Sequence, residues 1–169
     1  LYGRGDNYHP SNSHVLPSMI RKFYEAKTKG IDLVECWGTG NPKREFLFVD
    51  DLAEACVFVL ENISTDNEIL YENKNNYCGI LNVGVGLDIS IQDLAKMIAS
   101  IYDYKGEIIW DSSKPDGTPR KLLNISKLSN MGWEAKTSLK KGIKSTIQQY
   151  VEEARTKSSM HRGDFLPNE

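Results

Sequence analysis

Basic side chains in two polar loops are the residues of this sequence best suited to bind an anion. Lys43 and Arg44 follow a proline turn at the entry to an apolar segment. A second long loop holds Lys114, Arg120 and Lys121. Arginine can form two parallel hydrogen bonds with phosphate oxygens, whereas lysine acts as a point charge. A solvated charge pair explains the first loop equally well, but two such loops in a chain of net charge −2 favour a shared anion site.

Further candidates for the same pocket are an acid, an aromatic ring and an imidazole. Asp116 stands among the cations of the second loop and can accept a hydrogen bond from a ribose or base hydroxyl. Trp37 precedes a glycine turn and is either a core residue or a flat wall for a base or sugar. His14 begins a helix after a polar loop, where its imidazole can face a cleft, although most histidines are ordinary surface groups. His9 and His161 have weaker claims.

Two glycine turns resemble the start of a dinucleotide-binding site but lack its defining features. Gly38-Thr-Gly40 follows an expected strand, yet the fingerprint needs a third glycine and a helix, and Asn41-Pro42 and another strand come instead. In Gly84-Val-Gly86, Ile89 occupies the place of the third glycine. None of the eight tyrosines has a lysine four residues later, so a reductase Tyr-x-x-x-Lys pair is missing too. The cofactor-binding half is therefore not expected in this chain.

Composition excludes several other classes. The chain has 169 residues, 40% of them hydrophobic, which suits one soluble domain. Its net charge argues against a nucleic-acid partner, and no apolar run approaches the roughly 20 residues that span a bilayer. Cys36, Cys56 and Cys78 lack paired metal or redox spacing, so we expect no metal site and a reducing, cytoplasmic location. The abrupt start at Leu1 indicates a fragment.

Helical and strand patterns alternate along the chain and are expected to position these residues. Helices are predicted from Ser13 to Gly30, after a cap at Asp50 or Asp51, after Ser90, at 126–130 and after Ser138. Strands are predicted at 31–36, 45–49, 80–83 and 107–110. Residues 1–13 should form a loop without core residues, and residues 62–79 a surface excursion. The predicted domain spans 1–155, followed by a disordered tail at 156–169.

Several longer motifs are shared with a known enzyme family. Asn-Tyr-His-Pro-Ser-Asn-Ser-His-Val (7–15), Trp-Gly-Thr-Gly followed by Arg-Glu-Phe-Leu-Phe-Val-Asp-Asp (37–51), Asn-Val-Gly-Val-Gly (82–86) and Ser-Lys-Pro-Asp-Gly-Thr-Pro-Arg-Lys-Leu-Leu (113–123) resemble the GDP-L-fucose synthases. The similarity covers residues 1 to about 150. Arg-Glu-Phe-x-x-Val-Asp-Asp alone would indicate only the extended short-chain dehydrogenase/reductase superfamily, whereas the first and last motifs are more specific.

This resemblance implies a fold and a reaction. The expected fold class is α/β: the C-terminal substrate-binding portion of an extended short-chain dehydrogenase/reductase, a small mixed sheet with flanking helices that lacks most of the Rossmann domain. The family converts GDP-4-keto-6-deoxy-D-mannose to GDP-L-fucose by 3,5-epimerisation and NADPH-dependent 4-reduction. The resemblance thus implies a GDP-sugar substrate, NADPH or NADP held mostly by the absent half, and a homodimer as the full-length enzyme. The fragment alone is expected to be inactive.

Roles for individual residues follow from the same resemblance. His14 matches the catalytic acid of epimerisation, whose partner base would belong to the missing half. Leu1 matches the end of a segment at the nicotinamide, so Leu1 and His14 are the expected cofactor contacts. The matching substrate-binding positions are Lys22, Trp37, Arg44, Asp116 and Lys121. Lys22 stands where some members carry arginine, which weakens a bidentate interpretation there.

Other interpretations remain open. Another nucleotide-sugar epimerase or dehydratase of the superfamily would keep Arg44 and the Val-Asp-Asp segment without needing the His14 motif. A non-catalytic nucleotide-sugar-binding module is favoured for this polypeptide alone by the absent cofactor motifs. A structural fragment that binds nothing is the third alternative.

Overall fold

The computed structural model describes residues 1–73 and 76–156. From residue 157 on, the tail expected at 156–169, with His161, lies outside the described residues. The elements are α1 (Val15–Lys29), β1 (Leu33–Trp37), β2 (Lys43–Glu45), α2 (Val49–Asn62), the 3-10 turn η1 (Glu68–Leu70), β3 (Tyr71–Asn73), β4 (Asn76–Tyr77), β5 (Asp88–Ser90), α3 (Ile91–Tyr102), β6 (Glu107–Asp111), β7 (Arg120–Lys121), α4 (Ser126–Asn130) and α5 (Leu139–Thr156). Among the described helices, none is long and apolar enough to cross a membrane.

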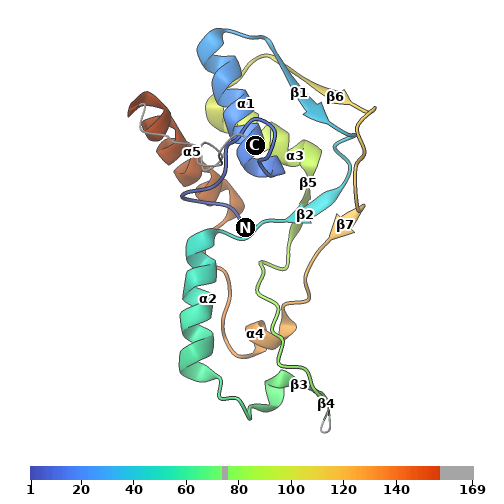
Figure 1. Ribbon diagram of the computed structural model, residues 1–169, viewed down its shortest axis with the longest axis vertical. Coiled ribbons are helices and arrows are strands. Elements are labelled where there is room, and N and C mark those ends of the chain that lie inside the picture. The colour runs from blue at the N-terminus through green and yellow to red at the C-terminus, as the bar shows by residue number, and fades with distance from the viewer. Residues whose placement is uncertain (74–75, 157–169) are drawn as a thin grey trace, which may run out of the picture.

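The main core lies where α1, α3 and α5 pack together beside β1 (Figure 1). Each helix turns an apolar stripe inward, because its apolar residues recur at helical spacing. Phe23 of α1, Ile98 of α3 and Ile143 of α5 are fully buried. Burial of one such side chain stabilises a fold by roughly 1.5–3 kcal/mol. This core fixes the start of α1, where the polar N-terminal loop ends.

The N-terminal loop also contributes to the core, so the expectation of a loop without core residues is wrong. Tyr2 and Tyr8 are buried, and the ring centroids of Tyr8 and Tyr150 lie 4.3 Å apart. Tyr2 forms an isolated parallel bridge with Phe48, in which the Tyr2 N–H donates to the Leu47 carbonyl. Two aromatic residues separated by polar and glycine residues give no periodic pattern, and the sequence therefore conceals them.

Within the described part of the chain, the strands form three small sheets. β1 and β6 pair in parallel, which confirms the strands expected at 31–36 and 107–110. β2 is the central strand of the second sheet, antiparallel to β5 and parallel to β7. In the pairing of β2 with β7, Arg44 lies opposite Lys121. The sheet thus sets two cations from distant parts of the sequence side by side.

Two expected strands are displaced or missing. The strand predicted at 45–49 ends at Glu45, and Leu47 and Phe48 are buried after it. The segment 80–83 forms no strand, and its backbone has no hydrogen bond to another residue within 1–73 or 76–156. A strand is stable where a neighbour pairs with its backbone groups, and no described segment offers that partner.

Capping signals set two of the helix ends as expected. Ser90 Oγ accepts a hydrogen bond from the Asp93 N–H at 3.0 Å, which confirms the predicted start of α3. Gly30 ends α1 with a left-handed φ of 65°, a conformation that glycine adopts without strain. At the other end of α1 the N-cap is His14 instead of Ser13, with no side-chain hydrogen bond.

The predicted capping of α2 by an aspartate is wrong. The helix begins at Val49, its N-cap is Phe48, and no side chain caps it. Asp51 lies in the first turn and is only 4% exposed. Its carboxylate accepts hydrogen bonds from the Thr137 N–H and hydroxyl, both at 2.9 Å. Asp51 therefore ties the start of α2 to the segment that leads into α5.

A smaller second core lies beside α2, and much of that helix stays uncovered. The buried members of this core are Leu47, Ala55, Leu128 and Trp133. Val57 and Leu60, two large apolar residues of this helix, are 53% and 84% exposed. Ile80 and Leu87 are also exposed, at 68% and 74%. Large apolar side chains are thus left uncovered around the second core.

Replacing Asp51 tests the link between α2 and α5. Asp51→Ala leaves the partly buried Thr137 donors without the carboxylate and should lower the free energy of unfolding by about 1–3 kcal/mol. Asp50→Ala is the matched control, because Asp50 is exposed and meets Arg4 only at 3.5 Å, so its loss should cost at most about 0.5 kcal/mol. Urea unfolding of both variants measures the difference. Equal losses would contradict the link.

Candidate functional site

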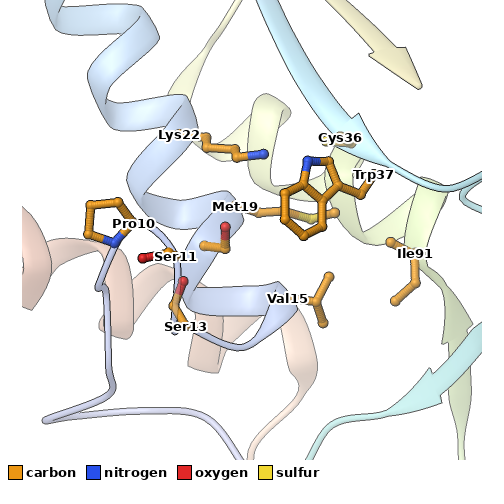
Figure 2. Close-up of a pocket in the computed structure, with 10 residues that line it drawn as sticks. Pro10, Ser11, Ser13, Val15, Met19, Lys22, Cys36, Trp37 and Ile91 are labelled. Atoms are coloured by element: carbon orange, nitrogen blue, oxygen red, sulfur yellow. The ribbon is translucent and has the colours of Figure 1, made fainter. Parts of the chain in front are cut away.

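Trp37 stands between two adjoining cavities near the start of α1. The first has a volume of about 300 Å³ and is lined by Ser11, Ser13 and Lys22, among others. Figure 2 shows these side chains around the same space as the Trp37 ring. The second has a volume of about 150 Å³, and Arg44 is among its lining residues. Because Trp37 lines both cavities, one ligand can contact its ring and extend from one cavity into the other.

Two ammonium groups lie near the exposed Trp37 ring. Lys22 Nζ is 5.9 Å and Lys114 Nζ is 5.5 Å from its centroid, within the range of cation–π attraction. Lys22 Nζ also donates a hydrogen bond of 2.8 Å to the Glu35 carbonyl, which orients it. Trp37 is 63% exposed, so its face is open to a ligand. An aromatic wall flanked by cations suits an aromatic ligand that carries negative charge.

Arg44 adds positive charge at the second cavity, which it lines. Its Nη1 donates to the Lys43 carbonyl at 2.8 Å, so the guanidinium folds back along β2. A Cβ on Gly117 would lie 3.7 Å from Arg44 Nη2, so the second basic loop passes close to the guanidinium. Lys121 is exposed on the neighbouring strand and lines neither cavity around Trp37. Arg44 is brought to the site, and Lys121 lies beside it.

His14 lies at the rim of the first cavity. Its chain neighbours Ser13 and Val15 both line that cavity, whereas the exposed imidazole does not. His14 is the N-cap of α1, and its carbonyl accepts the hydrogen bond of the Ser18 N–H. Its φ of −71° and ψ of 167° are extended. The helix start therefore fixes the backbone of His14 and leaves its ring free to reach a ligand.

Asp6 is a titratable neighbour of this region that sequence reasoning missed. Its Oδ1 accepts a hydrogen bond from the Asn7 N–H at 2.8 Å, whereas its buried Oδ2 has no partner within the described residues. Burial raises the pKa of the Asp6 carboxyl, and the Asn7 hydrogen bond and the charge of His14 offset part of that rise. Nothing in the sequence distinguishes Asp6 from other loop aspartates.

Both glycine turns are occupied by an internal carboxylate. Asp116 accepts hydrogen bonds from the Thr39 N–H and hydroxyl, both at 2.6 Å, which lowers the pKa of its carboxyl. A Cβ on Gly38 would clash with Asp116 Oδ1. Glu45 Oε1 accepts from the Val85 and Gly86 N–H groups at 2.5 and 2.6 Å. These backbone donors hold protein carboxylates and do not face a cofactor phosphate.

This arrangement affects the role predicted for Asp116 and reveals one for Glu45. Asp116 was expected to accept a ligand hydroxyl, yet both of its oxygens already bind Thr39. Glu45 was not singled out from the sequence, although it follows Arg44 directly. Besides the glycine turn, it binds the Leu123 N–H through Oε2 at 3.0 Å. The sequence offered two clues to this role of Glu45. One is its position directly after Arg44, and the other is the glycine turn at 84–86, whose N–H groups can bind a carboxylate.

The glycine turns of the described residues are filled from within by Asp116 and Glu45. Leu1 lines a separate cavity of about 330 Å³ with Leu47 and Val83, and His14 does not line it. Within 1–73 and 76–156 there is also no cluster of three potential metal ligands.

Comparison with known proteins defines the class. The profile of the NAD dependent epimerase/dehydratase family matches residues 1–76. The solved structure of a GDP-L-fucose synthetase from Naegleria fowleri bound to NADP is similar with a TM-score of 0.77 and 25% identity, over 92% of this chain and 45% of that one. Small sheets with flanking helices and these similarities define part of an extended short-chain dehydrogenase/reductase fold.

Curated relatives narrow the resemblance to the GDP-L-fucose synthases. The enzyme from Escherichia coli K12 is 47% identical over 152 residues, which cover 90% of this chain and 46% of the relative. GDP-L-fucose synthase 1 of Arabidopsis thaliana is 46% identical over 89% of this chain and 43% of the relative. The resemblance to GDP-L-fucose synthases inferred from the motifs is confirmed. The chain spans less than half the length of these relatives.

Two aspartates of the site should affect stability with opposite dependence on pH. The folded-state pKa of Asp6 is raised, so its ionisation destabilises the fold increasingly as the pH rises from its ordinary value near 3.8. Asp6→Asn should therefore be more stable than wild type at pH 7, with a smaller gain at pH 4. Asp116 has a lowered pKa, so Asp116→Asn should be less stable at pH 7, with a smaller loss at pH 4.

Urea midpoints of wild type and both variants at the two pH values provide the measurement. Each variant serves as the control for the other, since both replace an aspartate by its isosteric amide. The same sign of change for the two variants at pH 7 would contradict the assignment.

Proposed function

We propose that this chain is the nucleotide-sugar-binding part of a GDP-L-fucose synthase. The complete enzyme converts GDP-4-keto-6-deoxy-D-mannose to GDP-L-fucose by 3,5-epimerisation and NADPH-dependent 4-reduction. The observation that carries this proposal is the Trp37 wall, which adjoins two cavities and stands among cations from α1, β2 and the second basic loop. Identity above 45% with GDP-L-fucose synthases over nine-tenths of the chain supports the same conclusion.

In this proposal, cationic side chains bind the diphosphate of the substrate, and an aromatic ring contacts its base or sugar. Arg44 holds the diphosphate, with Lys121 on the adjacent strand and Lys22 across the Trp37 ring contributing further positive charge. Trp37 offers a flat face for the base or the sugar. Asp116 acts indirectly, because its hydrogen bonds to Thr39 fix the turn directly after Trp37.

His14 supplies a proton in the proposed epimerisation. The C3 and C5 protons of the substrate are acidic because both carbons flank the C4 ketone, so a base can remove each of them to give an enolate. His14, at the rim of the serine-lined cavity, then protonates the opposite face and inverts the centre. The base that removes the protons is assigned to a segment outside this sequence.

The cofactor-binding half is likewise assigned to residues outside this sequence. The uncovered apolar side chains of α2 and the exposed Ile80 and Leu87 offer a surface for such a half to pack on. The unpaired segment 80–83 can then join a strand of that half. Bound there, NADPH would supply the hydride for C4 reduction. We further propose a cytoplasmic location, a homodimer and an inactive isolated fragment.

The second candidate is a nucleotide-sugar-binding module without catalysis. The occupied glycine turns favour it for the 169-residue chain taken alone, because neither turn can hold a cofactor phosphate. Another nucleotide-sugar epimerase of the same superfamily remains an alternative for the complete enzyme. Turnover of a panel of nucleotide sugars by the complete enzyme separates these possibilities.

Removing the Arg44 guanidinium should weaken binding of GDP. A hydrogen bond to a charged group is worth about 1.5–3 kcal/mol, so Arg44→Ala should raise the dissociation constant of the complete enzyme for GDP roughly 10- to 150-fold. Lys141→Ala removes one exposed positive charge from α5 and is the control for general electrostatics, with no change expected. Calorimetric titration measures both. Equal affinities of Arg44→Ala and wild type would exclude a diphosphate contact.

Replacing His14 should slow epimerisation strongly and leave most of the NADPH affinity intact, because the cofactor is assigned mainly to the other half. His14→Asn removes the proton donor, and loss of general acid catalysis slows such steps by about 10²–10⁴-fold. NMR detection of the products inverted at C3 and C5, formed in deuterated solvent, measures the step directly, and NADPH titration is the control. Unchanged formation of the epimerised product would refute the role of His14.

A further inference from the structure

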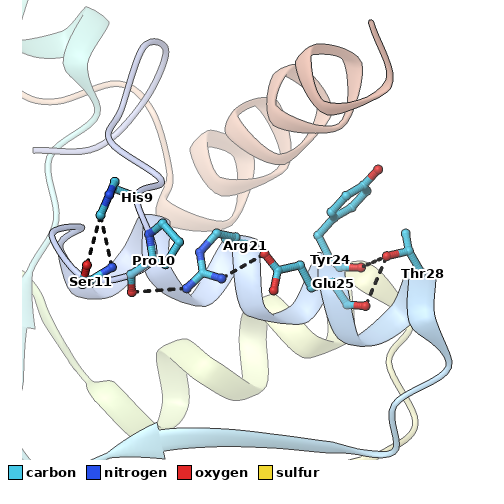
Figure 3. A network of polar contacts seen from close by, with 7 residues as sticks. All are labelled: His9, Pro10, Ser11, Arg21, Tyr24, Glu25 and Thr28. Atoms are coloured by element: carbon cyan, nitrogen blue, oxygen red, sulfur yellow. Dashed lines mark hydrogen bonds and ion pairs between the residues drawn. The ribbon is translucent and has the colours of Figure 1, made fainter. Parts of the chain in front are cut away.

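His9 is the hydrogen-bonding centre of the turn that precedes α1. Its Nδ1 accepts hydrogen bonds from the N–H groups of Ser11 and Asn12, both at 3.2 Å, and lies 3.3 Å from the Ser11 hydroxyl. Figure 3 shows the imidazole above the turn with its contacts to Ser11. The main chain of residues 9–12 thus folds around one ring nitrogen.

These contacts fix the protonation of the ring. A nitrogen that accepts from backbone N–H groups cannot carry a hydrogen itself. The contacts therefore assign the ring hydrogen to Nε2 and leave Nδ1 as the acceptor. The geometry also matches that of an asparagine whose side-chain oxygen accepts from the backbone two and three residues later. His9 takes the place of such an asparagine. In the sequence, His9 has a weaker claim to a function than His14, and this role in the turn is not visible there.

Two neighbouring side chains brace the same turn. Asn7 Oδ1 accepts from the His9 N–H at 2.9 Å, and Asn7 Nδ2 donates to the Asn12 carbonyl at 3.0 Å. Arg21, 8% exposed on α1, donates to the Pro10 carbonyl at 3.5 Å and pairs with Glu25 at 2.9 Å (Figure 3). The turn is thus closed at both ends and anchored to α1.

The turn presents one wall of the cavity beside Trp37. Pro10 and Ser11 line that cavity, as does Ser13 immediately before the N-cap His14. Within 1–73 and 76–156, His9 Nδ1 is the partner of the Ser11 and Asn12 N–H groups, so its loss removes the hydrogen bonds that hold these two groups in place. The positions of Ser11 and Ser13, and with Ser13 the path of the chain into His14, therefore depend on the imidazole of His9. That imidazole need not touch the ligand.

We propose that His9 is a positioning residue, whose Nδ1 acceptor holds Ser11 and Ser13 in place along the cavity beside Trp37 and aligns His14 for proton transfer. This inference rests on the proposed function for its catalytic consequence, whereas its structural half stands independently. The residues proposed to bind the diphosphate lie on elements other than this turn, since Arg44 is on β2 and Lys121 on β7. Loss of His9 should hence lower kcat more than it raises KM.

The structural half is tested on the 169-residue chain labelled with ¹⁵N. Long-range ¹H–¹⁵N correlation at neutral pH should show the His9 ring with its hydrogen on Nε2. Amide exchange of Ser11 and Asn12 should be about 10-fold or more faster in His9→Ala and close to wild type in His9→Asn, which restores an acceptor. A hydrogen on Nδ1, or equal exchange in the two variants, would overturn the inference.

The catalytic half is tested in the complete enzyme with NADPH and GDP-4-keto-6-deoxy-D-mannose. His9→Ala should lower kcat about 10-fold or more, as expected when a catalytic group is misplaced, and change KM less than about 3-fold, whereas His9→Asn should recover most of the wild-type kcat. Equal kcat in wild type and His9→Ala, or no recovery in His9→Asn, would overturn the positioning role. If the wild-type enzyme does not turn over this substrate, the proposed function fails, and the ring and amide measurements still decide the role of His9.

Discussion

Internal carboxylates that occupy the glycine turns are the interaction on which the site depends. Glu45 links the turn at 84–86 and the chain after β7 to the strand that holds Arg44. Asp116 links the second basic loop to the turn that follows Trp37. Backbone N–H groups in such turns attract anions, and here the protein supplies the anion itself. Through these hydrogen bonds, the two glycine turns connect segments that are far apart in the sequence.

The site that results is assembled from separate parts of the fold. α1 contributes Lys22, β1 ends at Trp37, and β2 holds Arg44. Each element is short, and contacts with its neighbours, more than its own propensity, fix its place. The helices α1, α3 and α5 provide the large core that makes this assembly rigid. The region around α2 has a smaller core and leaves large apolar side chains exposed.

Strongly periodic or capped elements were predictable from the sequence. α1, α3, β1, β6 and the short helix α4 lie where the patterns indicated, because apolar spacing and caps such as Ser90 act locally. The strand expected at 80–83 was not confirmed, because a strand depends on a paired neighbour and none is present among the described residues. Asp51 shows the same limit, since its partner Thr137 is 86 residues away.

Within the site, residue types were predictable and partnerships were not. The sequence by itself determined that cations, an indole and an imidazole are available, and its motifs determined the resemblance to GDP-L-fucose synthases. The tertiary structure alone decided that Trp37 adjoins two cavities, that Asp116 binds Thr39, and that His9 organises the turn before His14. The physical reason is that a hydrogen bond depends on distances of a few ångströms between groups, and the sequence does not record which distant groups the folded chain brings that close.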